Sequence, residues 1–378
     1  MNINGYIKKY GNKSYKEMPF NSIDALILSQ LCYMNLDKCG PTINEIHKHP
    51  VKLKNIVIKD KKDFYSSTVT PNPMKLMVSL MLKSSRYGNI YFGYSENNFD
   101  EKEVVQFFAT TFFLPDGNLF IAYRGTDTTL LGWKEDFLIT YMDEIKSQKM
   151  AVNYAKKILD SFPKNSYLGG HSKGGNLAMY TLLKIGSDYE DRVIKVFSFD
   201  GPGFRCGKKG FPAFNRVCNK FDKYITQNDL IGMVFIMVDT TKIVKSNSFL
   251  LGGHDPFGWQ IHNKEPEFIY CKERSRGSKI MVSALSKWLE KLNNADKELL
   301  IEAFFEVFKD AKTVFDLLLV GAKDIVFSKK TLQKYTKVEQ VKLKAYMDAF
   351  IQHYFDAFFN FKEPKQINNK QLKQVSVK

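Results

Sequence analysis

The sequence predicts an α/β fold whose central sheet is mostly parallel. Three short apolar runs, at residues 166–169, 193–199 and 223–226, have the length and composition of buried strands. Helix-compatible segments flank the first run, at 150–162 before it and at 176–185 after it. Strands that alternate with helices favour parallel pairing, with helices on both faces of the sheet.

A glycine-serine turn joins the first of these strands to the next helix. The segment 170–174, Gly-His-Ser-Lys-Gly, matches the G-x-S-x-G pattern of a nucleophile elbow. Such an elbow lifts the serine Oγ above the sheet, and the glycines leave room for tight packing on both sides. The pentapeptide alone would also fit an ordinary glycine-rich loop. The strand before it and the helix after it favour the α/β-hydrolase fold, with Ser172 as nucleophile.

The region before the elbow contributes further elements. A helix is expected within residues 18–31, with Pro19 at its boundary, Asn21 or Ser22 as the cap and Asp24 in its first turn. A short helix is expected over 74–82. Two strands, 104–114 and 119–123, read as a hairpin around the turn Pro-Asp-Gly-Asn at 115–118.

The composition changes near residue 273. Glycine becomes rare, and Lys-rich amphipathic runs predict helices at 279–292, 296–320 and 337–359. We therefore divide the chain into a hydrolase domain, 1–272, and a helical C-terminal region, 273–378. No group of residues typical of an active site occurs in this region. Its apolar residues at helical spacing are interpreted as a packing surface.

The formal net charge of the 378 residues is +16. Such a charge permits binding to nucleic acid or to an anionic membrane surface. No basic and aromatic nucleic-acid motif stands out, so we expect no nucleic-acid partner. An anionic membrane remains open as a partner, beside the simpler interpretation that Lys-rich composition spreads the charge everywhere.

The cysteines and the N-terminal sequence bear on the compartment. Five scattered cysteines without C-x-x-C spacing indicate free thiols and no zinc site. The first ten residues lack an apolar signal core, and no run of about 18 uncharged apolar residues occurs. We expect a cytoplasmic protein that needs no metal and no organic cofactor.

A serine nucleophile needs a general base, which is usually histidine. The chain has six histidines, and in α/β-hydrolases the base follows the serine. His254 lies in a loop with glycine and proline on either side, whereas His262 lies in a polar stretch without them. Loops of the first kind present side chains into clefts, so we select His254.

Two aspartates compete to orient His254. Asp200 and Asp229 each follow a predicted strand, and the carboxyl ends of parallel strands are where functional residues collect. Asp200 precedes Gly-Pro-Gly, a turn in which an aspartate can have a purely structural role. The sequence therefore favours Asp229 as the orienting acid.

Two backbone N–H groups are candidates for the oxyanion hole. One belongs to Lys173, directly after the nucleophile, and the other to Thr126, after the predicted strand 119–123. Arg124, two residues before Thr126, is expected to serve as a structural ion-pair partner, with Asp136 as one candidate.

Four motifs in this order resemble the Mbeg-like family, a group of bacterial α/β-hydrolase proteins related to the class 3, or fungal-type, lipases. They are Tyr-Arg-Gly-Thr at 123–126 with Trp133 and Asp-Phe at 136–137; Gly-His-Ser-Lys-Gly-Gly-Asn at 170–176; Gln-Asn-Asp at 227–229; and His-Asp-Pro-Phe-Gly-Trp at 254–259. The resemblance covers roughly residues 1 to 270 and implies the same roles for Ser172, Asp229, His254 and Thr126. Lys173 departs from many class 3 lipases, where a smaller or apolar residue is common.

These observations predict a serine hydrolase that cleaves carboxylic esters, of lipid or acyl type, through an acyl-enzyme. The alternative is a catalytically silent hydrolase fold that binds an anionic membrane or a protein partner. A complete set of serine, histidine, aspartate and oxyanion loop favours the enzyme.

Overall fold

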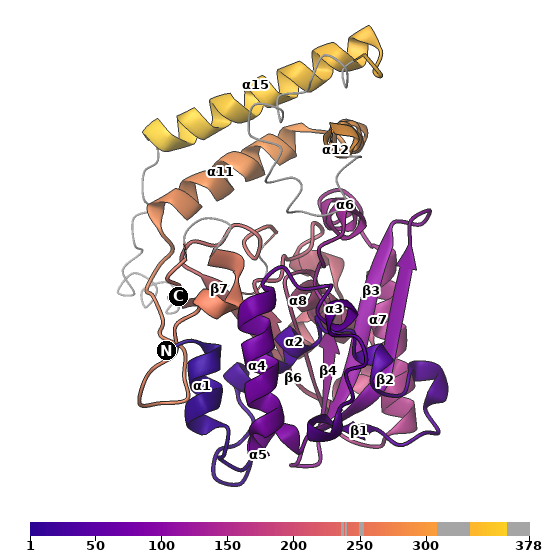
Figure 1. Ribbon diagram of the computed structural model, residues 1–378. Coiled ribbons are helices and arrows are strands. Elements are labelled where there is room, and N and C mark those ends of the chain that lie inside the picture. Colours follow the sequence, from indigo (N-terminus) through magenta and orange to yellow (C-terminus); the bar gives the residue numbers. More distant parts are fainter. Residues whose placement is uncertain (236–237, 239, 249–252, 308–332, 361–378) are drawn as a thin grey trace, which may run out of the picture.

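The computed structural model describes residues 1–235, 238, 240–248, 253–307 and 333–360. Its centre is one eight-stranded sheet in which the strands follow one another in chain order (Figure 1). The first four strands pair antiparallel, and every later pairing is parallel. The strands are β1 Val51–Lys52, β2 Tyr91–Asp100, β3 Val105–Phe113, β4 Leu119–Tyr123, β5 Ser166–His171, β6 Val193–Phe199, β7 Phe221–Thr226 and β8 Lys242–Val244.

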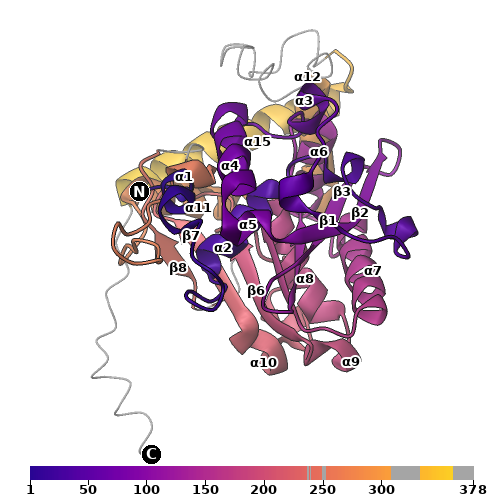
Figure 2. The same ribbon diagram turned by 60° about the horizontal axis from the view of Figure 1, so that its bottom comes forward.

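Helices cover both faces of this sheet, which confirms the predicted α/β class (Figures 1 and 2). One core joins α1, α2 and α4 to one face of the sheet, and a second core joins α7 and α8 to the other. The helices are α1 Ile3–Tyr10, α2 Ser22–Leu31, α3 Lys61–Phe64, α4 Pro71–Lys83, α5 Ser85–Gly88, α6 Leu130–Leu138, α7 Lys146–Ser161, α8 Lys173–Lys184, α9 Ser187–Glu190, α10 Phe214–Val217, α11 Arg276–Lys291, α12 Asn294–Val307 and α15 Lys337–Asn360.

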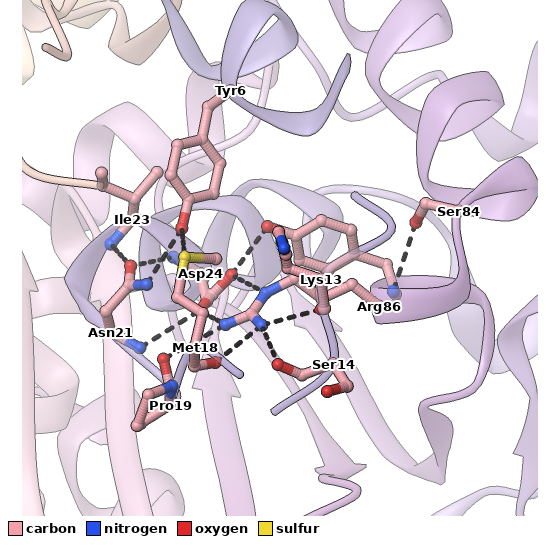
Figure 3. A network of polar contacts seen from close by, with 11 residues as sticks. Tyr6, Lys13, Ser14, Met18, Pro19, Asn21, Ile23, Asp24, Ser84 and Arg86 are labelled. Carbon is pink, nitrogen blue, oxygen red and sulfur yellow. Dashed lines mark hydrogen bonds and ion pairs between the residues drawn. The ribbon is translucent and has the colours of Figure 1, made fainter. Parts of the chain in front are cut away.

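A buried ion pair fixes the N-terminal helices against α5 (Figure 3). Arg86 Nε donates to Asp24 Oδ1 at 2.9 Å, and the Tyr87 hydroxyl donates to the same oxygen at 2.7 Å. Asp24 also completes the capping box of α2 by accepting from the backbone N–H of Asn21. The predicted first-turn acid is therefore a buried network residue as well as a helix cap.

The C-terminal helices lie across one end of the sheet, above α6 in Figure 1. Helix α11 packs along α15, where Trp288 Nε1 donates to the carbonyl of Tyr346 at 2.8 Å. Helix α12 meets α6 through the rings of Phe305 and Phe137, 5.8 Å apart. The helix expected over 296–320 is described as far as Val307, and the rest of that range lies outside the described residues.

Among the described residues, no helix has the length and apolar character needed to cross a membrane. The division of the chain at residues 272 and 273 stays a prediction. The contacts of α11 and α12 with the sheet end, however, make the helical region part of the surroundings of the site.

Candidate active site

Ser172 lies at the turn between β5 and α8, with φ 58° and ψ −131°. A positive φ is strained for a residue with a Cβ and costs on the order of 1–3 kcal/mol. The Ser172 N–H donates to the carbonyl of Phe199 on β6 at 2.8 Å, which ties the turn to the neighbouring strand. Glycine is required beside it, because a Cβ on Gly170 would collide with Gly174 and one on Gly174 with the Tyr123 carbonyl.

His254 approaches this serine from the loop after β8. Its ring centroid lies 4.5 Å from that of His171, the residue that precedes Ser172. No hydrogen bond joins His254 to Ser172 among the described residues. Such bonds are often long before substrate binds. Burial lowers the pKa of His254 below its usual value, and the nearby Asp229 opposes that shift.

Two carboxyl groups face the same nitrogen of His254. Asp200 Oδ2 lies 3.3 Å from His254 Nδ1, and Asp229 Oδ1 lies 4.0 Å from it. Both aspartates are fully buried, and Asp200 Oδ1 and Asp229 Oδ2 have no hydrogen-bond partner among the described residues. Burial raises the pKa of each carboxyl well above its usual range, and for Asp229 the neighbouring Asp200 raises the pKa further.

A buried lysine balances the two acids. The Lys223 ammonium on β7 donates to the carbonyl of Gly201, and burial lowers its pKa to about 8. Asp229 accepts from the Ile231 N–H at 2.9 Å, and its carbonyl accepts from the Ser278 hydroxyl on α11 at 2.5 Å. The predicted acid is thus beside the predicted base, but Asp200 is nearer. The assignment of Asp229 as orienting acid stays a prediction.

The two predicted oxyanion donors border the serine. Within the described residues, neither the Thr126 N–H nor the Lys173 N–H has an acceptor. The loop that carries Thr126 packs on the elbow, because a Cβ built on Gly125 would lie 3.1 Å from the Ser172 Cβ. Free N–H groups beside a nucleophile are what an oxyanion hole requires.

Asp136 on α6 holds the oxyanion loop. The Thr126 hydroxyl donates to Asp136 Oδ2, and burial raises the Asp136 pKa to about 6. The expected pairing of Arg124 with Asp136 is wrong. Arg124 instead donates to the carbonyls of Cys32 and Met34, at 2.9 and 2.8 Å, because these carbonyls follow the end of α2 and satisfy the buried guanidinium.

The Lys173 side chain points away from the nucleophile into a buried ion pair. Its ammonium donates to Glu135 Oε2 at 2.6 Å and to the Gln106 carbonyl at 2.7 Å. Both charged side chains are fully buried. The Lys173 cation is therefore neutralised by Glu135 of α6, the helix that also carries Asp136.

A cavity of about 260 Å³ adjoins Ser172. Asp136 and Lys173 line it from the sheet end, and apolar side chains of α11 and α12 close the opposite wall. Among the α11 and α12 residues that line it are Leu285, Trp288, Leu289, Leu300 and Ile301. Sequence reasoning missed this contribution, because a packing stripe and a ligand-facing stripe have the same helical spacing.

One group of side chains offers metal-ligand atoms. The nitrogens of His171 and His254 and an oxygen of Asp200 lie within 4.8 Å of one another. His171, however, already bonds on both sides, to the Tyr33 hydroxyl at 3.2 Å and to the His254 carbonyl at 2.9 Å. Its ring is therefore occupied in positioning the His254 loop.

Comparison with known proteins relates the chain to one family. The model of the Mbeg1-like family matches residues 81–306, more than half of the chain and a range that includes Ser172, Asp229 and His254. Among solved structures, a mutant of MDLA from Penicillium cyclopium is similar with a TM-score of 0.38 and 10% identity, over 67% of this chain and 86% of that chain. A comparison with curated proteins gives no match.

Proposed function

The chain belongs to the Mbeg1-like family, and from this premise we propose that it is a serine hydrolase of carboxylic esters, with lipid or other acyl esters as substrates. One observation carries the proposal. Ser172 occupies a strained elbow beside two unpaired N–H groups, with an imidazole backed by buried acids close by and an apolar cavity in front of it.

In the proposed reaction, Ser172 Oγ attacks the acyl carbon while His254 accepts the hydroxyl proton. The negative charge that develops on the carbonyl oxygen is stabilised by the N–H groups of Thr126 and Lys173. His254 then returns the proton to the leaving alcohol, and an acyl-enzyme remains. Water, activated by the same imidazole, releases the acid and restores the serine.

The buried acids stabilise the imidazolium that forms during each step. Asp229 is the orienting acid in this proposal, and Asp200 shares the charge with it. The reaction requires no metal and no organic cofactor, because every proton is transferred between Ser172, His254, substrate and water. The five free cysteines are in keeping with the proposed cytoplasmic compartment.

The test replaces Ser172 with alanine and follows hydrolysis of a short p-nitrophenyl ester. We expect turnover to fall to background while the circular dichroism spectrum stays unchanged. Ser187→Ala, at an exposed position at the start of α9, is the matched control and should keep full turnover. Equal turnover in the two variants would exclude Ser172 as the nucleophile, and a folded wild-type protein without turnover would favour the silent scaffold instead.

A further inference from the structure

We propose that the substrate carries a phosphate group close to its acyl ester, and that Lys297 on α12 binds this phosphate. The proposal rests on the ester hydrolysis proposed above and adds the class of substrate. It follows from a second cavity next to the first and from a buried cation on the wall that the two cavities share.

The first cavity suits a hydrocarbon chain. Its walls are mainly apolar side chains from α6, α11 and α12, and Ser172 lies in its lining. Apolar surfaces exclude water and favour burial of an acyl chain, by about 0.8 kcal/mol for each methylene group. The volume of about 260 Å³ is near the lower end for small-molecule sites, which favours one acyl chain over two.

The second cavity, of about 530 Å³, is more polar. It shares four lining residues with the first, namely Val234, Leu285, Leu289 and Lys297. Arg205 and Ser286 also line it. These shared residues make the two cavities neighbours, and the proposal places the apolar chain of the substrate in the first and its polar head at the second.

Lys297 is the charged group on that wall. It is 9% exposed, and no carboxylate pairs with it among the described residues, although Glu290 also lines the second cavity. Burial lowers its pKa, and the nearby cation Arg205 lowers the pKa further. Arg205 itself pairs with the exposed Asp143 at 2.5 Å.

A buried ammonium without a counter-ion is costly, and an anionic ligand removes that cost. Lys297 has no such partner among the described residues, and Arg205, which pairs with Asp143, can add hydrogen-bond donors to a phosphate, whose several oxygens accept more of them than a carboxylate does. With the phosphate at Lys297 and the chain in the apolar cavity, the acyl part lies in the cavity that Ser172 lines, and the phosphate lies at a residue that lines both cavities.

The experiment compares two substrates with the same single acyl chain in the full-length protein. One is a lysophosphatidic acid, and the other is the monoacylglycerol that lacks its phosphate. We expect Lys297→Met to lower the ratio of kcat/KM for the phosphate ester over the neutral ester at least about tenfold, as expected for one charge-assisted hydrogen bond. Lys297→Arg should restore much of the ratio.

Lys287→Met is the matched control, because Lys287 is an exposed lysine of α11 and lines neither cavity. It should leave the ratio unchanged. Inorganic phosphate should inhibit the wild-type protein competitively and inhibit Lys297→Met more weakly. A long-chain acyl-coenzyme A carries its phosphates a pantetheine arm away from the thioester, so its turnover should not depend on Lys297. A loss in Lys297→Met as large as that for lysophosphatidic acid would contradict a phosphate close to the ester.

An unchanged ratio in Lys297→Met, or an equal loss in Lys287→Met, would overturn the phosphate site. In either case hydrolysis of the p-nitrophenyl ester by the wild type would leave the proposed function intact. Absence of any Ser172-dependent hydrolysis would instead overturn the proposed function itself.

Discussion

The general base is an imidazole in surroundings that disfavour its charge. Burial lowers the pKa of His254. The nearby acids Asp229, Asp136 and Asp255 raise this pKa, but by less than burial lowers it. A base acts when it is neutral, so activity should rise with pH as His254 loses its proton. The neutral form is reached at a lower pH than for a free histidine.

The first prediction follows from this shift. The acidic limb of the kcat/KM profile for a p-nitrophenyl ester should have its midpoint below pH 6.5, the usual histidine value. The measurement is the rate between about pH 4 and pH 9 at constant ionic strength. A midpoint above 6.5 would contradict this prediction, because it would mean that the carboxylates raise the pKa of His254 by more than burial lowers it.

The second prediction concerns the two acids at His254. Burial raises the pKa of each carboxyl, and the neighbouring Asp200 raises that of Asp229 further, so each acid makes the other harder to ionise. If one of them is replaced by asparagine, the remaining acid can still ionise and hold the imidazole. We therefore expect Asp200→Asn and Asp229→Asn each to lower kcat less than the double variant, which should lose about 10⁴-fold.

Steady-state kinetics of the three variants tests this sharing, and a urea melt of each shows whether it folds. If one single variant loses as much as the double variant, that acid alone orients the base. The sequence narrowed the choice to these two positions. It favoured Asp229, but the structure brings Asp200 to the same imidazole, because β6 and β7 are parallel neighbours whose carboxyl ends lie side by side.

At the scale of elements, one buried ion pair joins the nucleophile elbow to α6. Lys173 belongs to the first turn of α8, and Glu135 belongs to α6, next to the Asp136 that holds Thr126. The two halves of the proposed oxyanion hole are thereby linked. Sequence patterns gave no signal for this pair, because its residues lie far apart in the chain.

The third prediction is that Lys173→Met will destabilise the protein by about 3–5 kcal/mol, since it leaves Glu135 charged and buried. Adding Glu135→Gln should recover a large part of that loss. Urea unfolding measures both values. Lys184→Met, at an exposed position near the end of the same helix, is the control and should change stability little. A single variant as stable as the wild type would contradict a structural role for the pair.

Some elements were predictable and others were not. The strands β5 and β6 and the helices α2 and α7 have strong apolar patterns, and the structure contains them with small shifts at their ends. Strand β2 went unrecognised because its second half, Ser-Glu-Asn-Asn at 95–98, is polar and has low strand propensity. Its antiparallel pairing with the β-branched and aromatic β3 provides the stabilisation that its own sequence lacks.

At the scale of the whole molecule, the C-terminal helices combine two surfaces. One side of the α11–α12 pair faces the apolar cavity, and α15, which packs along α11, adds Met347 to the lining. Large apolar side chains of α15 are exposed, namely Val338, Val341, Ile351, Phe355, Phe358 and Phe359. The sequence predicted that the apolar residues of this helix pack against other helices. That prediction explains the contacts of α15 with α11, but it does not explain why these six side chains are exposed.

The fourth prediction is that α15 contacts an anionic membrane, as the net charge of +16 favours. The protein should co-sediment with phosphatidylglycerol vesicles, less at high salt and less with phosphatidylcholine. Phe355→Glu combined with Phe359→Glu should weaken binding, whereas Phe99→Glu, at an exposed position on β2, should not. Equal binding by both variants would contradict this role for α15.

The central claim, that Ser172 is an activated nucleophile, is tested most directly by covalent labelling with a fluorophosphonate probe followed by peptide mapping. The account predicts one labelled site, Ser172, with labelling lost in Ser172→Ala and slowed as pH falls below the His254 pKa. A folded wild-type protein that takes up no label, or that is labelled at another serine, would contradict it.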